Sequence, residues 1–535
     1  MIVPMRHLDL ICVAAESEAT LERLRALGAV HLDLARAEGA GVVSARGELE
    51  EAEKAVRLIL KARGGEEESV RPLSVKEALA IDVDRETLKS EKDRLERLIK
   101  AYEPYGDFDP ALARKLLNRG IDLADRLPEK LPEMRLGRMR EKLARVENRI
   151  AIDTAKLARG DDRAILNRYP ELKDRLAFAA AKELLENRGA VSVVSGWVPQ
   201  AQVEGVAAAA RTNGWGVLFR KPAEGEVPPT LVEPPKFVRP VKALFEGLGI
   251  APAYEESDVS VPFMCYFTLF FAMLVGDGAY GAIFLVATLL LRKRMPKSWF
   301  VLMTVFSLAT VAWGALSNTW FGAGIPWCAD WPTVRWLAGA DAEAGHQYDN
   351  MMFLCFTIGV SHLMLARLWN GIVRINSLDC LSEFGWAGIV LFMYVLTNSI
   401  VGIFPGIPTW CYWMFGVSFL TVFVRAKGMD KGMLFLNAMS VLGDIISYVR
   451  LFAVGLASVQ VAANFNGMAL GLGLPPWIKW LPVVLIMLVG HGLNLAMAGL
   501  SVLVHAVRLN TLEFSNHKGI SWAGYAFRPF TKTKE

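Results

Sequence analysis

The sequence lacks the motifs that mark several common classes of protein. It has no phosphate loop of the form GxxxxGK followed by Ser or Thr, so we do not expect the chain to bind nucleotide itself. It has no basic patch with interleaved aromatic residues, and its formal net charge is only +4, which argues against nucleic-acid binding. The six cysteines are scattered without a CxxC pair, so we expect buried thiols in preference to disulfides or metal ligands.

The N-terminus also lacks the features of a signal peptide. Arg6, Asp9 and Glu16 interrupt what would be its apolar core. We therefore expect residues 1–255, which are rich in Lys, Arg and Glu, to stay in the cytoplasm. Long apolar runs dominate residues 259–511, as in chains that span a bilayer. The sequence thus predicts a cytoplasmic domain over 1–255 and a membrane domain over 256–535.

Strand and helix patterns alternate at both ends of the cytoplasmic part. Residues 5–15, 16–27 and 28–35 have the patterns of a strand, a helix and a strand. Residues 189–222 repeat that order. We expect the two segments to form one α/β lobe, made of 1–40 and 189–222.

Between these segments the chain has the pattern of long amphipathic helices. Residues 44–63 and 85–101 are charged, with apolar residues at helical spacing, and we expect them to pair with 138–158 or 171–188. A segment that begins at Tyr105 has turn residues, one short helix and one strand-like piece, so a second α/β lobe over about 103–180 is predicted. The fold class is therefore mostly α, with a dumbbell of two lobes joined by a coiled coil.

Apolar runs in the second half predict transmembrane helices. With seven crossings, the basic loop 292–297 would lie outside, although Lys and Arg tend to stay cytoplasmic. If residues 261–291 instead cross twice and break at GDGAYG (276–281), every basic loop and the tail lie inside. We therefore predict about eight spans, the last two long and tilted, with both termini in the cytoplasm. The runs are 261–291, 299–321, 351–369, 386–404, 409–424, 433–465 and 477–507.

An arginine lies within one of these runs. Residues 442–465 place Arg450 near the middle of an apolar helix, with no neighbouring acidic residue closer than Asp444. A guanidinium keeps its proton, and holding it at bilayer depth costs several kcal/mol unless water or a carboxylate compensates. If no acid of this chain lies at the same depth, we expect the partner to be a carboxylate of another subunit or a moving ion carrier.

The last run carries a polar stripe. Asn494, Ser501, His505 and Arg508 are spaced seven, four and three residues apart, which is compatible with a water path along one helix face. Several alternatives stay open. Arg508 could snorkel to the interface, and Asn494, His505 and His491 could form ordinary interhelical hydrogen bonds. Asp444 could line a channel or lie at the interface, and for Asp277 we favour capping of the break at GDGAYG over ion handling.

The segment SYVRLFAVGLASVQ, residues 447–460, resembles the arginine-bearing helix of the membrane subunit of rotary V/A-type ATPases, called subunit a or subunit I. HAVRLNTLEF and GYAFRPF near the C-terminus, GWVP at 196–199, YGDFDP at 105–110 and the segment 262–281 resemble the same family, with the short chain fitting its prokaryotic members. The chain departs from the family at Ser458, where eukaryotic members carry His, and at Ala498, where some carry Glu.

The resemblance implies a stator subunit without cofactors or metal. Its expected partners are a ring of rotor subunits with buried carboxylates, peripheral-stalk subunits at the N-terminal lobes, the lipid bilayer and, indirectly, the catalytic ATPase subunits. It implies that Arg450 and Arg508 act on ring carboxylates, and that proton or sodium transport is coupled to ATP hydrolysis or synthesis elsewhere, in a prokaryotic inner membrane. The residues implied for the ion pathway are Asp444, Ser447, Gln460, Asn494, Ser501, His505 and Glu513.

The alternative from another class is a secondary transporter with a cytoplasmic regulatory domain, which would use Arg450 to bind an anionic substrate. Such transporters usually contain internal repeats and paired broken helices. This sequence has one broken segment, at 276–281, and no second copy of it.

Overall fold

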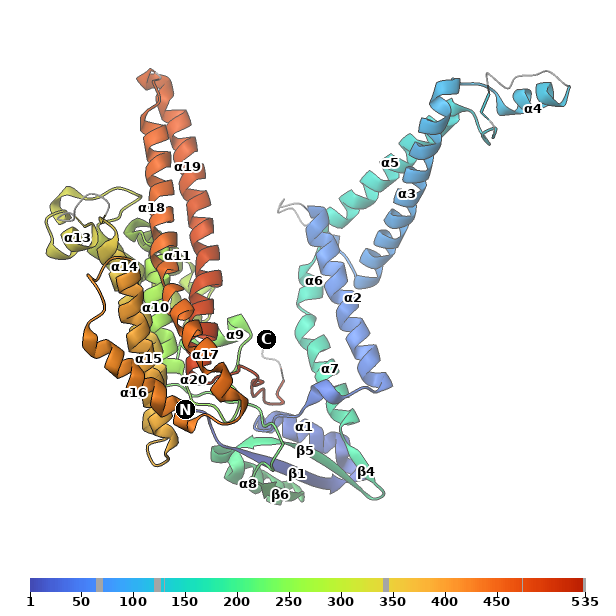
Figure 1. The fold of residues 1–535 in the computed structure, drawn as a ribbon. Coiled ribbons are helices and arrows are strands. Elements are labelled where there is room, and N and C mark those ends of the chain that lie inside the picture. Colours follow the sequence, from blue (N-terminus) through green and yellow to red (C-terminus); the bar gives the residue numbers. More distant parts are fainter. Residues whose placement is uncertain (64–70, 120–126, 129, 340–345, 474, 533–535) are drawn as a thin grey trace. The chain divides into compact units, whose positions relative to one another are not determined.

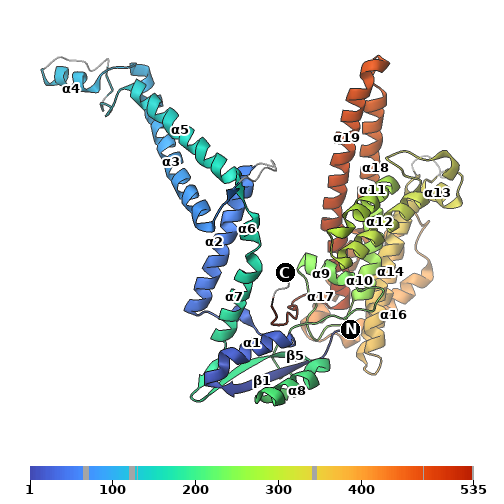
Figure 2. The ribbon, with the colours of Figure 1, turned by 180° about the vertical axis from the view of Figure 1, so that it is seen from behind.

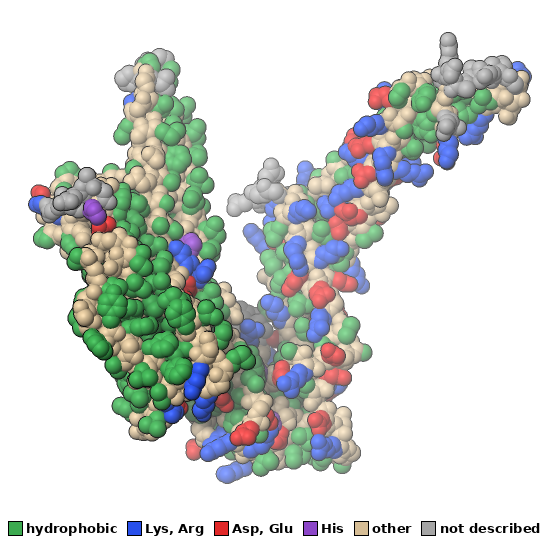
Figure 3. Space-filling view, viewed as in Figure 1, with side chains coloured by type: hydrophobic (Ala, Val, Ile, Leu, Met, Phe, Trp, Pro, Cys, Tyr) green, Lys and Arg blue, Asp and Glu red, His purple; other side chains and the backbone are tan. Residues whose placement is uncertain are grey.

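The computed structural model describes residues 1–63, 71–119, 127, 128, 130–339, 346–473 and 475–532. The chain is mostly helical and divides into two compact units (Figure 1). One unit contains Met5–Pro222 together with the tail that begins at Arg528, and the other contains Met1–Pro4 and Ala223–Phe527. We describe them as the sheet unit and the apolar unit. Charged side chains are spread over the sheet unit, whereas large areas of the apolar unit are hydrophobic (Figure 3).

The sheet unit is built on four antiparallel strands in the order β4-β5-β1-β6. Alternate residues of β1, Leu8, Leu10 and Cys12, are buried in one cluster with residues of helices α1 and α8, as a sheet with one covered face requires. The two segments predicted to share a lobe are thus paired through β1, β5 and β6. The elements are β1 (Met5–Val13), α1 (Ser17–Leu27), β4 (Glu186–Arg188), β5 (Val191–Pro199), α8 (Val203–Asn213) and β6 (Gly216–Arg220).

The strand predicted over residues 28–35 is wrong. Only His31 pairs with the sheet, through an isolated bridge to Trp197, and a short 3-10 helix, η2 (Leu34–Arg36), follows. Val30 and Leu32 on either side of His31 are buried in the core of this unit. Their apolar character therefore reflects burial in the core and not a strand.

The C-terminal tail is part of the sheet unit. Phe530 is 3% exposed and belongs to the same hydrophobic cluster as β1. Its backbone N–H donates to the Val30 carbonyl at 2.7 Å, and the Arg528 N–H donates to His31 Nδ1 at 2.9 Å. Residues at the two ends of the sequence thus share one core.

Four long helices continue the sheet unit as two pairs (Figure 2). Helix α2 packs against α7, and α3 packs against α5, so the two alternatives for helix pairing are both realised. A capping box at Ser74 and Glu77 begins α3, and a short parallel pair of strands lies between the helix pairs. The elements are α2 (Ala40–Arg63), β2 (Arg71–Pro72), α3 (Val75–Tyr102), α5 (Leu136–Ala158), β3 (Gly160–Asp161), α6 (Arg163–Leu166) and α7 (Tyr169–Glu183).

The segment after α3 contains the predicted short helix. After η3 (Glu103–Tyr105), Asp109 caps α4 (Pro110–Asn118) by accepting a hydrogen bond from the Ala111 N–H at 3.0 Å. The strand-like piece predicted to follow falls largely on 120–126, outside the described residues. A distal α/β lobe therefore stays a prediction.

All the predicted apolar runs form helices in the apolar unit. The helices are α9 (Val241–Leu248), α10 (Ser260–Val275), α11 (Gly278–Leu290), η5 (Leu291–Lys293), α12 (Lys297–Ser317), η6 (Pro326–Cys328), α13 (Pro332–Leu337), α14 (Asp349–Val373), α15 (Asp379–Ile400), α16 (Thr409–Arg425), α17 (Met429–Ile446), α18 (Val449–Leu470), α19 (Pro476–Ser501) and α20 (Ser515–Lys518). In the described part of the chain, 5 helices are long and apolar enough to cross a membrane, or 6 if the bent pair α10 and α11 counts as one span. The number of eight spans stays a prediction.

The break predicted within 261–291 is present. Helices α10 and α11 are bent by 117° at the GDG segment. Asp277 caps α11 through Oδ1, which accepts from the Ala279 N–H at 2.8 Å, and its Oδ2 accepts from the Gly322 N–H at 2.8 Å. The capping role favoured for Asp277 is therefore confirmed.

The last two candidate spans are the longest. They cover Lys431–Leu470 and Ile478–Lys518, with 40 and 41 residues. At 1.5 Å per residue, each would reach about 60 Å if straight, against a hydrocarbon core of about 30 Å. Both must therefore tilt, bend or extend beyond the hydrocarbon region. Their central helices α18 and α19 lie side by side (Figures 1 and 2).

Candidate functional site

Arg450 lies at a break in its span. A turn at Ser447 and Tyr448 separates α17 from α18, so Arg450 is in the first turn of α18 and not in the middle of a continuous helix, as the sequence had indicated. The combined span Lys431–Leu470 still has residue 450 near its centre. The Nε of Arg450 donates to the Ser447 carbonyl at 2.9 Å, which holds the guanidinium against the turn.

Arg450 has an acidic partner in its own chain. Its Nη2 lies 2.8 Å from Oε1 of Glu513, a residue that is 3% exposed. The Nε of Arg508 lies 3.4 Å from the same oxygen. A partner on another subunit was expected only if no acid of this chain lay near Arg450. Glu513 is such an acid, so that condition is not met. Two arginines share one carboxylate, so the cluster of Arg450, Arg508 and Glu513 keeps one net positive charge.

Unusual helix winding explains why this pairing was not predicted. In an α-helix, residues five apart lie about 140° apart around the axis, so Arg508 and Glu513 would point in different directions. The structure is π-helical over η7 (Val502–Ala506) and η8 (Leu509–Phe514), where hydrogen bonds join residues five apart. This winding brings Glu513 to the same side as Arg508. Glu513 was expected in the ion pathway, but nothing in the sequence marked it as the partner of Arg450.

The cluster is not sealed. The side chains of Arg450 and Arg508 are 22% and 53% exposed, whereas that of Glu513 is 4% exposed. The Nη1 of Arg450 donates to none of the described residues. Glu513 Oε2 is buried and accepts no hydrogen bond within the described part of the chain. Arg450 is therefore oriented by Ser447 and Glu513 and keeps donors free for a further partner.

A second polar network begins at Asp444. Its Oδ2 lies 3.1 Å from Nε2 of His517, and Nδ1 of His517 accepts from Arg367 Nε at 3.1 Å. Arg367 in turn lies 3.3 Å from Glu383, which also pairs with Arg374 at 3.0 Å. Of these residues only Asp444 was predicted as a site residue. His517, Arg367 and Glu383 were missed because they come from three separate helices.

A third network joins α11, α18 and α19. Asn494 Nδ2 donates to the Ser458 carbonyl at 2.8 Å and to the Tyr280 hydroxyl at 3.0 Å. Tyr280 also lies 2.8 Å from Nδ1 of His491, whose Nε2 lies 3.0 Å from Oδ1 of Asn466. Asn494 and His491 therefore do form the interhelical hydrogen bonds that were one of the open alternatives. Tyr280, which lies within the segment 276–281 where the break was predicted, was not predicted as a site residue.

The other predicted residues are not joined to these networks. Gln460 is exposed, and Ser501 and His505 are partly buried. Within the described residues, no hydrogen bond links Ser501 or His505 to Arg450 or Asn494, and His505 Nδ1 is buried without a partner.

The cysteines are free thiols, and the prediction of burial is only partly right. Cys12, Cys328, Cys355 and Cys411 are buried, whereas Cys380 is partly exposed and Cys265 is exposed.

No family model matches the chain. It is 29% identical to V-type ATP synthase subunit I 1 of Treponema pallidum over an alignment of 635 residues, which covers 99% of this chain and 100% of the relative. This chain is a homologue of subunit I of V- and A-type ATP synthases.

Two further subunit I proteins are similar to the chain over part of their length. It is 33% identical to V-type ATP synthase subunit I of Borreliella burgdorferi over 64% of this chain, and the match spans only 60% of that relative. It is 24% identical to A-type ATP synthase subunit I of Methanocaldococcus jannaschii over 79% of this chain and 67% of the relative. The subunit I homology extends over both units, because the Treponema match covers 99% of the chain.

Proposed function

We propose that this chain is the membrane stator subunit of a V/A-type rotary ATPase, and that it forms ion half-channels against a rotating ring of membrane subunits. The observation that carries the proposal is the cluster of Arg450, Arg508 and Glu513, which keeps a net positive charge at the centre of a candidate span. The homology to subunit I supports the same assignment.

The proposed role of Arg450 follows from its charge and its free donors. A carboxylate that a rotor subunit brings past the guanidinium is favoured in its ionised form, so it releases its proton or sodium ion. The same fixed charge opposes direct passage of a cation through a region of low dielectric. Glu513 and the Ser447 carbonyl hold the guanidinium in place, and because Glu513 is shared with Arg508 it leaves the cluster positive.

The polar networks on either side of Arg450 are candidates for the two access routes. Asp444 lies six residues before Arg450, on the other side of the turn at Ser447 and Tyr448. Ser458 lies eight residues after Arg450, which separates the two by about 12 Å along the axis of α18. One route would use Asp444 and His517, and the other would use Asn494 and Tyr280. Ser447, Gln460, Ser501 and His505 belong to the proposed pathway as further lining residues.

The sheet unit is proposed to act in the stator. Its long helix pairs and sheet offer surfaces for peripheral-stalk subunits, and the catalytic subunits would be coupled only indirectly. ATP chemistry belongs to those other subunits in this proposal. The chain would be an integral protein of a prokaryotic inner membrane, with both termini in the cytoplasm.

Purification from native membranes tests this assignment. A mild-detergent preparation of the tagged full chain is expected to contain soluble ATPase subunits and a small membrane subunit that carries a buried carboxylate. An unrelated tagged membrane protein from the same cells is the control. A chain that is isolated alone, while its detergent extract retains an intact ATPase, would favour the secondary transporter. That alternative is disfavoured because the described residues contain one bent helix pair and such transporters usually contain two.

A further inference from the structure

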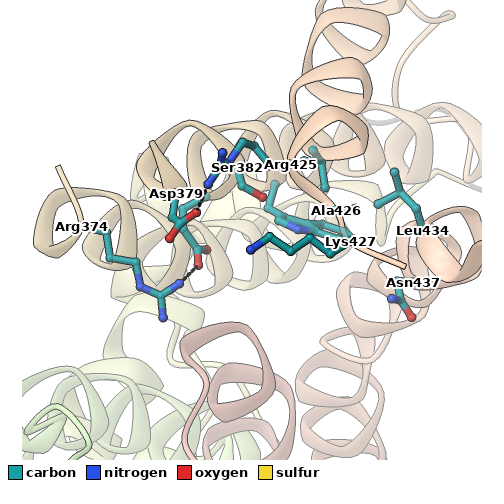
Figure 4. Close-up of a pocket in the computed structure, with 11 residues that line it drawn as sticks. Arg374, Asp379, Ser382, Arg425, Ala426, Lys427, Leu434 and Asn437 are labelled. Atoms are coloured by element: carbon teal, nitrogen blue, oxygen red, sulfur yellow. Dashed lines mark hydrogen bonds and ion pairs between the residues drawn. The ribbon is translucent and has the colours of Figure 1, made fainter. Parts of the chain in front are cut away.

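A cavity of about 340 Å³ lies where three helices of the apolar unit begin or end (Figure 4). Asp379 is the first residue of α15, Arg425 is the last residue of α16, and α17 begins at Met429. Ends of apolar spans lie close to the membrane surface, where lipid headgroups are found. The cavity contains none of the residues of the Arg450 cluster. Arg374 and Glu383 belong to the far end of the polar network that begins at Asp444, but the proposed access routes do not use either of them.

Basic side chains outnumber acidic ones around this cavity. Arg425 pairs with Asp379 at 2.5 Å, and Arg374 pairs with Glu383 at 3.0 Å. Glu383 is also shared with Arg367, at 3.3 Å, although Arg367 does not line the cavity. The ionisable side chains that line the cavity are Arg374, Arg425 and Lys427 with Asp379 and Glu383, so together they carry a net charge of +1.

The donors of these side chains are only partly used. Arg374 and Arg425 each donate one hydrogen bond to a carboxylate within the described residues, although a guanidinium has five N–H groups. Lys427 is exposed and forms no ion pair with any described residue. In Figure 4 the Lys427 side chain extends toward Asp379, while Arg374 approaches the carboxylates from the opposite side. An anion in the cavity would therefore meet donors from more than one direction.

One wall of the cavity is apolar. Trp386, Val422 and Leu434 line it, and the Arg367 guanidinium lies 5.1 Å from the Trp386 ring centroid. Basic pockets between membrane helices at the headgroup level are a known way to hold anionic lipids. The cationic donors of the cavity would bind the anionic headgroup of a lipid, and the apolar wall would contact its hydrocarbon chains.

We propose that this cavity binds the phosphate group of an anionic ligand through Lys427, Arg425 and Arg374. A phospholipid headgroup and free inorganic phosphate share this chemistry, and the experiment separates the two sources. The inference is independent of the proposed function, because it rests on the charges and the position of this cavity alone.

The test uses the purified full chain, delipidated in neutral detergent. Native mass spectrometry counts bound dioctanoyl phosphatidylglycerol, with zwitterionic dioctanoyl phosphatidylcholine as the comparison lipid. Equilibrium dialysis with radiolabelled phosphate measures the free anion. Lys427→Glu is the test variant, since Lys427 is exposed and has no ion pair to lose. Lys297→Glu is the matched control, because Lys297 is likewise an exposed lysine close to the end of an apolar helix but does not line the cavity.

We expect one molecule of phosphatidylglycerol to bind in preference to phosphatidylcholine, and Lys427→Glu to weaken it about tenfold while Lys297→Glu leaves it unchanged. Saturable binding of inorganic phosphate with the same dependence on Lys427 would assign the site to the free anion. The proposal is overturned if neither probe binds. It is equally overturned if Lys427→Glu and Lys297→Glu bind both probes as the unmodified chain does.

Discussion

Glu513 Oε1 lies 2.8 Å from Arg450 Nη2, although 63 residues separate the two in sequence. The contact joins the first turn of α18 to the π-helical end of the last span. A carboxylate within the chain therefore fixes the arginine on which the proposed transport depends.

Glu513→Gln is expected to destabilise the chain. The amide keeps the size of the side chain but removes the charge that compensates Arg450 and Arg508. Removing one partner of a fully buried pair costs about 3–5 kcal/mol, and we expect about 1–3 kcal/mol here because both arginines are partly exposed. Thermal unfolding of the full chain in detergent measures the effect. Glu246→Gln is the control, because Glu246 is exposed and forms no ion pair with the described residues. Equal melting temperatures for the two variants would argue against a stabilising pair.

Gly314→Ala is expected to disturb the packing of α11 on α12. A Cβ at position 314 would lie 2.2 Å from both N and Cα of Gly278, and backbone atoms cannot move aside as a flexible side chain can. Overpacking of this kind typically costs about 1–3 kcal/mol. Gly416→Ala, in α16, is the matched control, since nothing lies within 4 Å of its Cβ position. If both variants unfold at the same temperature, the close approach of Gly278 and Gly314 does not exist in solution.

Phe530→Ala is expected to release the C-terminal tail from the sheet unit. Phe530 is buried, and truncation of a buried Phe costs about 3–5 kcal/mol. The Phe530 amide, which donates to the Val30 carbonyl, offers a direct readout of tail docking. Hydrogen exchange of this amide should become faster in the variant, while Phe237→Ala, at a side chain that is 73% exposed, should leave it unchanged. Unchanged protection in Phe530→Ala would mean that other contacts hold the tail.

The docking of the tail is expected to weaken in acid. Burial lowers the pKa of His31 below its ordinary value of 6.5, although the nearby Arg528 carbonyl favours the charged form. The His31 ring is therefore neutral when the tail is docked. Below about pH 6.5 the ring of the undocked state becomes protonated, whereas the ring of the docked state stays neutral down to its lowered pKa. The contribution of His31 to the free energy of docking is therefore complete above about pH 6.5 and is lost as the pH falls toward the lowered pKa.

The pH dependence can be measured at the same amide. The protection factor of Phe530, corrected for the intrinsic effect of pH on exchange, should fall between pH 8 and pH 5.5. His31→Gln, which cannot titrate, should show a smaller change over this range. An equal fall in both proteins would assign the effect to other groups.

Local patterns in the sequence were sufficient to predict most of the helices. Apolar runs predicted the membrane helices, and the GDG segment predicted the bend at Asp277, because chain geometry and capping depend on residues close in sequence. The prediction of a strand over residues 28–35 was wrong because the burial of Val30 and Leu32 in the core requires the same apolar pattern as a strand.

Contacts that depend on distant residues could not be predicted. The pairing of Glu513 with Arg450 requires π-helical winding, and no sequence pattern in residues 502–514 predicts such winding. His517 and Arg367 meet Asp444 only after three helices have packed together. The residue types of the site were therefore accessible from the sequence, whereas its internal partners were not.

Arg450→Ala tests whether ion transport depends on the Arg450 guanidinium. The measurement is ATP-driven ion uptake, with and without sodium, into inverted membrane vesicles that contain the assembled complex, with ATP hydrolysis recorded in parallel. We predict that the Arg450→Ala complex assembles and hydrolyses ATP but that its uptake falls to background, while Arg508→Ala is impaired and retains some uptake. ATP-driven uptake that persists in Arg450→Ala would mean that ion transport does not require the Arg450 guanidinium.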